Sequence, residues 1–335
     1  MKKYVNLFVF VFMIGACLSQ GRAQTKSAVS YKNPVVDIAM PDPTVIKAAD
    51  GYFYVYATES TRNVPIMKSK DLVEWTYCNT AFTNKTRPRF EPKAGIWAPD
   101  INYINGKYVL YYAMSVWGGE QTCGIGVATA DSPQGPFTDH GKMFRSNEIG
   151  VQNSIDPSLL QYEGRNYLVW GSFRGIYVIE LTADGLSIMP GAKKKRIAGT
   201  AFEAVYIHKH DDYYYMFASI GSCCQGVKST YKVVVGRSKK VWGPYKDKTG
   251  KPMLKNGYSL VIGANDHFVG NGHGSQIIRD AAGQDWLLYH GFLRSTPENG
   301  RILLLDQIKW DQEGWPYVEG GSPSYETQKA PVFNN

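Results

Sequence analysis

The sequence contains few cysteines, and their spacing excludes several kinds of site. Five cysteines occur among 335 residues, and no two of them are separated by the two residues typical of paired zinc ligands, so a structural zinc site is not expected. Apart from Cys17 the cysteines are Cys78, Cys123, Cys223 and Cys224. Adjacent cysteines rarely bond to each other without strain, so a bond between Cys223 and Cys224 is not expected. The pairing cannot be read from the sequence.

Other familiar signals are also absent. The glycine-rich segment GNGHGS at 270–275 lacks the Lys-Ser/Thr ending and the strand-to-helix context of a phosphate-binding loop. Charged residues make up only 20% of the chain, and no long amphipathic helix is evident. The basic cluster KKKR at 193–196 has no interleaved aromatic residues. We expect it to form a solvated loop, and we expect no nucleic-acid partner.

A single long apolar run is present, and it lies at the N-terminus. Residues 1–23 have a charged start, an apolar stretch over residues 7–18 and a small-residue cleavage site ending at Ala23, which is typical of a secretory signal peptide. The residues before Cys17 also match a bacterial lipobox, so lipid anchoring at Cys17 is the alternative. No other segment is apolar enough to span a bilayer. We therefore expect an exported protein, periplasmic or extracellular, soluble or lipid-anchored.

The remainder of the chain repeats one pattern five times: an apolar strand, a polar turn and an aromatic-rich strand. The units begin at residues 42, 100, 156, 203 and 273, with strong turn signals such as Asn105-Gly106 between the strands. Glycine is frequent (34 residues) and aromatic residues reach 13%, which suits short strands joined by turns. Five antiparallel units of this size predict an all-β fold, a single five-bladed β-propeller over residues 34–320. A β-sandwich would not explain the repetition.

The repeat predicts where the chemistry lies. Inner strands of propeller blades run parallel to one another, so residues at equivalent places in the repeat gather at one end of the central channel. The residues at that place are Asp42, Asp100, Asp156, Glu203 and His273. Convergent carboxylates raise one another's pKa and are rarely kept without a function. A cluster of carboxylates in a sequence without a nucleophilic cysteine, a phosphate loop or a zinc signature suits glycoside hydrolysis. In that reaction one acid protonates the departing oxygen and a second carboxylate activates water or attacks carbon.

Several residues near this basin have two interpretations each. Trp97 and Phe173 either stack on a sugar ring or pack in the core. Asp100 either contacts substrate or is a buried acceptor of backbone hydrogen bonds. His273 is either a hydrogen-bonded core histidine or a ligand of a cation in the channel.

These motifs, in this order, resemble family 43 of the glycoside hydrolases, the five-bladed propeller enzymes that act on arabinan, arabinoxylan and related plant glycans. The resemblance covers about residues 34 to 320. The matching segments are DPTVI (42–46), WAPDI (97–101), IDPSL (155–159), FEA (202–204), GSCC (221–224), STYKVVVGRS (229–238) and GHGS (272–275).

The resemblance implies a role for each carboxylate. Asp42 resembles the general base that activates water, Glu203 the general acid, and Asp156 the third carboxylate that orients the acid and tunes its pKa. The implied reaction is single-displacement hydrolysis with inversion. His273 resembles the histidine that holds a calcium ion in the channel.

The GSCC segment, with Cys224, resembles the border of the substrate groove in the arabinanase branch. It favours internal cleavage of α-1,5-arabinan, a plant polysaccharide. We expect the protein to be a monomer. The sequence departs from that branch at Met40-Pro41, where many members carry a histidine before the aspartate, and in GHGS, where GHNS is commoner.

Three alternatives stay open. An exo-acting α-L-arabinofuranosidase or β-xylosidase of the same family would share the three carboxylates. A retaining fructan-cleaving propeller would open with Asn-Asp-Pro-Asn-Gly, which is missing here. A carbohydrate-binding propeller without catalysis would not need three carboxylates in register.

Overall fold

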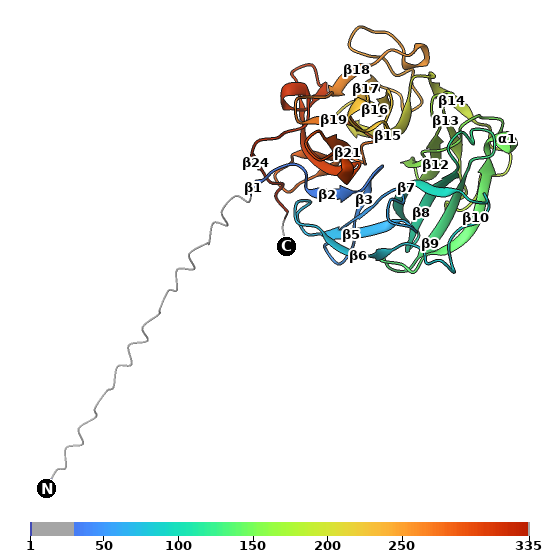
Figure 1. Ribbon diagram of the computed structural model, residues 1–335, viewed down its shortest axis with the longest axis horizontal. Coiled ribbons are helices and arrows are strands. Elements are labelled where there is room, and N and C mark those ends of the chain that lie inside the picture. The colour runs from blue at the N-terminus through green and yellow to red at the C-terminus, as the bar shows by residue number, and fades with distance from the viewer. Residues whose placement is uncertain (2–29, 334–335) are drawn as a thin grey trace.

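A computed structural model describes residues 30–333, together with Met1. The predicted signal segment and Cys17 lie outside the described residues, apart from Met1. Five sheets surround a central axis (Figure 1), which confirms the predicted all-β five-bladed propeller. Among the described residues, no helix has the length and apolar character needed to cross a membrane.

Each of the first four blades is a four-stranded antiparallel sheet whose strands follow one another in the chain. Blade 1 contains β3 (Thr44–Lys47), β4 (Phe53–Tyr56), β5 (Pro65–Ser69) and β6 (Thr76–Thr80). Blade 2 contains β7 (Gly95–Ile104), β8 (Lys107–Ser115), β9 (Gly124–Ala130) and β10 (Thr138–Arg145). Blade 3 contains β11 (Ser158–Tyr162), β12 (Arg165–Trp170), β13 (Ile176–Glu180) and β14 (Lys195–Ala198). Blade 4 contains β15 (Glu203–His210), β16 (Tyr213–Ile220), β17 (Lys232–Ser238) and β18 (Ser259–Ile262).

The fifth blade combines strands from both ends of the chain, which the repeat did not predict. Its order is β19-β21-β22-β2, and β2 precedes the first repeat. The strands are β2 (Val36–Ala39), β19 (Phe268–Gly272), β20 (Ile278–Arg279), β21 (Asp285–Leu293), β22 (Ile302–Trp310) and β23 (Pro316–Tyr317). A further pair, β1 (Ser30–Tyr31) with β24 (Gln328–Lys329), joins the two chain ends beyond the predicted range. The ring is therefore closed by pairing of N-terminal with C-terminal segments (Figure 1).

The same irregularity interrupts the inner strand of every blade. In blade 2, Trp97 faces Ala113 while Asp100 faces Tyr111, so two residues of β7 lie opposite one residue of β8. The pairing of β15 with β16 in blade 4 shows the same β-bulge. In blades 1, 3 and 5 the extra residue lies beside the strand, where Thr58, Gly171 and Ser275 donate backbone hydrogen bonds to Pro41, Ile155 and Leu288 one residue out of the register of the adjoining pairs. The first bulge residue has a positive φ each time: 53° at Asp42, 41° at Ala98, 55° at Asp156, 54° at Ala204 and 49° at His273. A bulge of this kind re-aims the side chains beside it.

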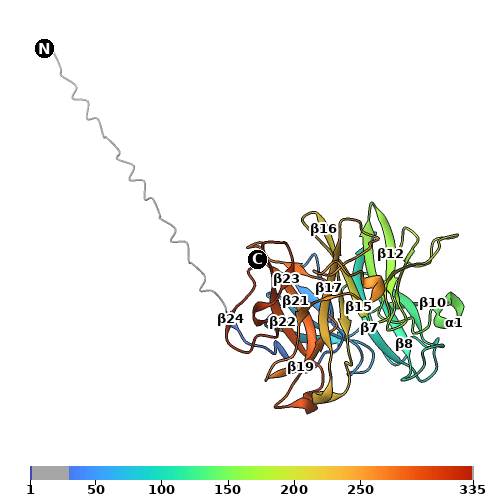
Figure 2. The ribbon, with the colours of Figure 1, turned by 90° about the horizontal axis from the view of Figure 1, so that it is seen from above.

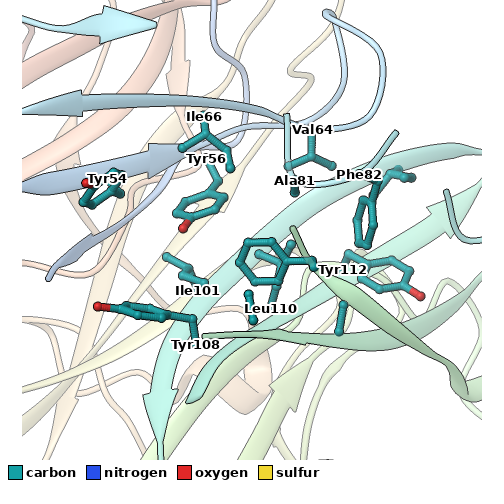
Figure 3. Close-up of a cluster of buried hydrophobic side chains, with 14 of the residues drawn as sticks. Tyr54, Tyr56, Val64, Ile66, Ala81, Phe82, Ile101, Tyr108, Leu110 and Tyr112 are labelled. Carbon is teal, nitrogen blue, oxygen red and sulfur yellow. The ribbon is translucent and has the colours of Figure 1, made fainter. Parts of the chain in front are cut away.

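Apolar side chains fill the spaces between neighbouring blades. Figure 3 shows one such cluster, in which Tyr56 and Ile66 of blade 1 face Ile101, Leu110 and Tyr112 of blade 2. These five side chains are fully buried. Packing of this kind, repeated around the ring, fixes the blades relative to one another and so fixes the inner strands that carry the predicted site.

Few helical turns connect the strands. They are α1 (Ser146–Ile149) and the short 3₁₀ turns η1 (Gly226–Lys228), η2 (Met253–Lys255), η3 (Pro297–Asn299) and η4 (Glu319–Gly321). The Asn105-Gly106 turn lies between β7 and β8 as predicted, with both residues at positive φ. The basic cluster is only partly a loop, because Lys195 and Arg196 begin the outer strand β14. Charged side chains on an outer strand discourage further strand pairing there.

Candidate active site

The predicted site residues converge on one cavity at one end of the channel. The cavity has a volume of about 640 Å³. Seven of the eight predicted side chains line it: Asp42, Trp97, Asp156, Phe173, Glu203, Cys224 and His273. The bulges explain this convergence, because Asp42, Asp156 and His273 are the first bulge residues of blades 1, 3 and 5, and Glu203 directly precedes the bulge residue of blade 4.

Asp100 is the exception, and its predicted substrate contact is not supported. It lies two residues beyond the bulge residue Ala98, so it is equivalent to Thr44 rather than to Asp42. Its residue exposure is 1%, and it accepts hydrogen bonds from the Tyr206 hydroxyl (2.6 Å) and the Leu159 backbone N–H (2.7 Å). Burial raises the pKa of Asp100 to about 6 despite these donors. Asp100 therefore matches the alternative interpretation, a buried acceptor that ties inner strands together.

Asp42 is surrounded by cations and donors. Its Oδ1 lies 2.7 Å from Arg301 Nη1, 3.2 Å from His273 Nδ1 and 3.3 Å from His290 Nδ1, and its Oδ2 accepts a hydrogen bond from the Thr58 hydroxyl at 2.6 Å. Burial alone would raise the pKa of this carboxyl, but Arg301 and His273 outweigh burial and hold the pKa well below its usual range. Asp42 is thus ionised near neutral pH and suited to accept a proton.

His290 contacts Asp42 through the Asp42 backbone. The Asp42 backbone N–H donates to His290 Nδ1 at 3.0 Å, so Nδ1 is the acceptor nitrogen of a neutral ring. Burial and the positive charge of Arg301 hold the pKa of His290 well below its usual range. A neutral His290 adds no charge of its own, so the cations that act on Asp42 are Arg301 and His273.

Glu203 and Asp156 form a buried acidic pair across blades 3 and 4. Glu203 Oε2 accepts a hydrogen bond from the Ser172 hydroxyl at 2.6 Å, and the Tyr231 hydroxyl also hydrogen-bonds Glu203. Asp156 Oδ2 accepts the backbone N–H of Ala204 at 3.1 Å. Burial is the main cause that raises the pKa of both carboxyls, and each also lies in the negative field of Asp42. The pair therefore retains a proton at pH values where Asp42 has lost its own.

One ionised carboxylate and one proton-bearing pair face the same cavity. This combination can remove a proton from water and supply a proton to a departing oxygen in one step. The environments of the three acids push their pKa values apart, as division of roles between a base and an acid requires.

The repeat could not identify most of the residues that hold these carboxylates. Arg301 and His290 belong to blade 5 and reach Asp42 only because β2 closes that blade. Thr58 and Ser172 lie just after the second strands of blades 1 and 3, and Tyr231 lies just before the third strand of blade 4, so none is on the inner strand that carries the repeat. One signal was available: a polar residue follows the second strand in both Tyr56-Ala57-Thr58 and Trp170-Gly171-Ser172.

Removing the positive charge of Arg301 should change the pH dependence. In an Arg301→Gln variant the pKa of Asp42 loses its strongest lowering influence and rises. Because the base acts in its ionised form, the acid limb of the kcat/KM profile should move to higher pH. Arg301→Lys keeps the charge and should move the limb less. Profiles of the two variants that coincide with the wild type would contradict this role for Arg301.

Aromatic side chains form one wall of the cavity. Trp97 is half-buried, and its ring centroid lies 6.4 Å from that of Trp117, which the sequence reasoning did not identify. Trp117 is 81% exposed and also lines the cavity, on the loop between β8 and β9. An indole that is this exposed beside a carboxylate cavity contributes little to core packing, and its flat face suits stacking on a sugar ring.

We expect Trp117→Ala to weaken substrate binding and leave the chemical step intact. Loss of one stacking face should raise KM several-fold with kcat within a factor of about two, since none of the hydrogen bonds described above for Asp42, Asp156 and Glu203 involves the indole and uniform binding affects KM. The thermal unfolding midpoint should not change because the side chain is exposed. Steady-state kinetics on oligosaccharides of increasing length measure this, with Trp117→Phe as the control that retains a ring. An equal drop in kcat would place Trp117 in the chemical step instead.

The cavity lining also contains an unexpected disulfide. Cys223 and Cys224 are bonded to each other, contrary to the expectation from their adjacency, while Cys78 and Cys123 are free thiols. The two bonded residues lie in the loop between β16 and η1, where no strand pairing restricts the backbone. Both line the cavity.

The surroundings of His273 do not provide a set of calcium ligands. Calcium takes six to eight oxygen ligands, whereas His273 offers one imidazole and its Nδ1 already faces Asp42 at 3.2 Å. Among the described residues, the only three metal-ligating groups close enough to share an ion are His208, His210 and Asp285. A calcium ion beside His273 would have to take most of its ligands from water.

Comparisons with known proteins agree with this geometry. Residues 31–316 match the model of the glycosyl hydrolases family 43. The chain is 36% identical over 290 residues to the extracellular endo-α-(1→5)-L-arabinanase 1 of Bacillus subtilis (strain 168), covering 82% of this chain and 86% of that protein. It is 35% identical to the extracellular exo-α-(1→5)-L-arabinofuranosidase ArbA of Cellvibrio japonicus (strain Ueda107), covering 83% of this chain and 86% of that protein.

The fold is similar to that of solved arabinanase structures. The α-L-arabinanase of Cellvibrio cellulosa, complexed with arabinohexaose, superimposes with a TM-score of 0.76 at 33% identity and covers 85% of this chain and 96% of that chain. An exo-1,5-α-L-arabinanase from a bovine ruminal metagenomic library gives a TM-score of 0.73 at 32% identity, covering 87% and 98%. With the family match over most of its length, an arabinanase-like propeller and three carboxylates in one cavity, the chain belongs to family 43 of the glycosyl hydrolases.

Proposed function

We propose that this glycoside hydrolase is an inverting endo-α-1,5-L-arabinanase, in which Asp42 activates water and Glu203 protonates the departing oxygen. The observation that carries the proposal is the split environment of the acids: Arg301 and His273 keep Asp42 ionised, while burial keeps a proton on the Glu203–Asp156 pair. An ionised base together with a protonated acid is what single displacement by water needs. The similarity to the Bacillus subtilis endo-arabinanase supports arabinan as the substrate.

Asp156 has the supporting role in this scheme. It shares the buried proton with Glu203 and accepts the N–H of Ala204, the residue after Glu203. It therefore positions the acid through the backbone as well as through charge. When Glu203 gives up its proton, the buried pair would carry two negative charges, which favours rapid reprotonation of Glu203 for the next cycle.

Product analysis tests the proposal. The purified protein is incubated with linear arabinan, branched arabinan, arabinoxylan and galactan, and early products are separated by chromatography. Mixed oligosaccharides from linear arabinan are expected, and proton NMR should show the anomer opposite to that of the substrate bond. A retained anomer would overturn the mechanism. Hydrolysis confined to a different glycan would overturn the substrate assignment without affecting the mechanism.

An exo-acting α-L-arabinofuranosidase is the second candidate. The similarity to the Cellvibrio japonicus exo-enzyme, at 35% identity, is nearly as high as that to the endo-enzyme. Release of arabinose alone from the earliest times would select this candidate.

We further propose that a calcium ion assists the site through His273, without taking part in the chemistry. The three carboxylates that line the cavity, Asp42, Asp156 and Glu203, favour a cation there, and His273 would contact that ion in the neutral form of its ring. Removal of calcium with a chelator should lower activity, and added Ca²⁺ should restore it; unchanged activity after chelation would contradict the proposal.

We also propose that the chain is exported, as its extracellular relatives are. We propose that it acts as a monomer, since one chain supplies the whole cavity.

A further inference from the structure

A second group of ligating side chains lies far from the hydrolytic cavity. His208 and His210 are at the end of β15, five and seven residues beyond Glu203, and they alternate so that both point to the same face of the strand. Figure 2, which views the ring from its edge, shows the strands running from one face of the propeller toward the other. At about 3.3 Å per residue, His210 is roughly 20 Å along the strand from Glu203. This group therefore belongs to a different part of the molecule.

Asp285 completes the group from the next blade. It is the first residue of β21 in blade 5, and its side chain is 1% exposed. Its Oδ2 lies 3.7 Å from His210 Nδ1. One ligand atom from each of His208, His210 and Asp285 lies within 4.8 Å of the other two. The three side chains thus converge across the boundary between blades 4 and 5.

The two histidines are held in place by their neighbours, but one ring nitrogen lacks a hydrogen-bond partner. Nε2 of His208 is buried and has no hydrogen-bond partner. An unpartnered buried ring nitrogen is costly unless it binds a ligand. The ring of His210 stacks on the indole of Trp310, with centroids 3.7 Å apart and an interplanar angle of 5°. The same indole N–H donates to Asp285 Oδ2 at 2.8 Å, as groups around metal ligands commonly do.

Arg279 now takes the place that a cation would occupy. Its guanidinium donates to both oxygens of Asp285, at 2.8 and 3.0 Å, and its Nη2 lies 3.3 Å from His210 Nδ1. The side chain is 56% exposed, so it can move into solvent, at the cost of its two hydrogen bonds to the buried Asp285, which the ion would replace. The guanidinium shows that this cluster attracts positive charge, and a divalent ion would compete with it for the same atoms.

We propose that His208, His210 and Asp285 form a zinc-binding site that clamps blades 4 and 5 on the side of the ring away from the hydrolytic cavity. Two imidazoles and one carboxylate are a ligand set that Zn²⁺ prefers, with water in the remaining position. Zinc ligands lie about 2.0–2.2 Å from the metal, so in a tetrahedral site they are about 3.4 Å from one another. The ligand atoms, which now lie within 4.8 Å of one another, therefore need to close by up to about 1.4 Å once Arg279 leaves.

The test uses the untagged full-length protein and Zn²⁺ alone as the probe. Isothermal titration calorimetry should show one zinc ion per chain, and the thermal unfolding midpoint should rise by several degrees when zinc exceeds its Kd. His208→Gln and His210→Gln should each weaken binding at least about tenfold, since each removes one of three ligands. Arg279→Gln should tighten binding because it removes the competing guanidinium.

Controls keep the result unambiguous. His140→Gln alters an exposed histidine whose ring nitrogen contacts Thr129, and it should bind zinc as the wild type does. Circular dichroism and the metal-free unfolding midpoint verify that each variant is folded. The proposal is overturned if the wild type binds no zinc, even if Arg279→Gln does, or if binding survives unchanged in both His208→Gln and His210→Gln.

Discussion

A Glu203→Gln variant is expected to lose activity on polysaccharide by about 10³-fold or more in kcat, in line with the removal of a general acid. The amide has no proton to give to the departing oxygen. It still fits among the contacts to Ser172 and Tyr231, so the fold should be unaffected. Removing one of two buried carboxyls also relieves the repulsion within the Glu203–Asp156 pair.

The leaving group separates loss of the acid from loss of structure. An aryl arabino-oligosaccharide that releases an acidic phenol needs little protonation. Glu203→Gln should therefore retain a far larger fraction of wild-type activity on this substrate than on polysaccharide. Glu313→Gln, an exposed substitution, is the matched control and should behave as the wild type on both substrates. Full polysaccharide activity in a folded Glu203→Gln variant would refute the assignment of the acid.

An Asp42→Asn variant should be at least as inactive, with a loss of about 10³-fold or more. The Glu203–Asp156 pair retains its proton, and the other carboxylates that line the cavity, Glu59 and Glu120, are held in salt bridges to Arg87 and Arg174. The loss should be equally large on the aryl substrate, since a better leaving group does not replace the base. The residual kcat of the variant on both substrates is measured in discontinuous assays with long incubation times. A variant that recovers on the aryl substrate would mean that Asp42 and Glu203 have been assigned in reverse.

Asp37→Asn is the control for charge and position. Asp37 is exposed on β2, five residues before Asp42, and it should be neutral for activity and stability. The stability of Asp42→Asn is informative in itself, because Arg301 and the protonated form of His273 would lose their buried counterion. A group whose folded pKa is depressed stabilises the fold above its unfolded pKa, and this stabilisation is lost as the pH falls through the folded pKa. The variant should therefore be less stable than the wild type at neutral pH but differ little from it at low pH, where Asp42 of the wild type is protonated in both the folded and the unfolded state.

The sequence repeat was sufficient to predict the number of blades and the convergence of Asp42, Asp156, Glu203 and His273. It succeeded because the Asp-Pro phrase marks a bulge, and the bulge recurs in every inner strand. It misplaced Asp100 because register was judged from carboxylates rather than from the bulge; the segment Ala98-Pro99 is the true equivalent of Asp42-Pro43. A shift of two residues along a strand moves a side chain deeper into the channel and away from substrate.

Contacts between distant segments could not be predicted in the same way. Arg301 and His290 reach Asp42 through the pairing of β2 with β22, and no local pattern reports that pairing. Trp117 lies on a loop whose path depends on the neighbouring blade. The bond between Cys223 and Cys224 depends on the conformation of one loop, which adjacency in the sequence does not reveal.

Because β2 closes blade 5, the site can form only after the C-terminal strands have been synthesised. Asp42 begins blade 1, yet Arg301 and His273, which set its charge state, and His290, which accepts its backbone N–H, are all made after residue 272. During synthesis a nascent chain that has folded its first four blades would already pair Asp156 with Glu203 but would leave Asp42 without its cations. Hydrolytic competence therefore arrives only with the last strands, so a prematurely terminated or C-terminally clipped product should be inert rather than partly active.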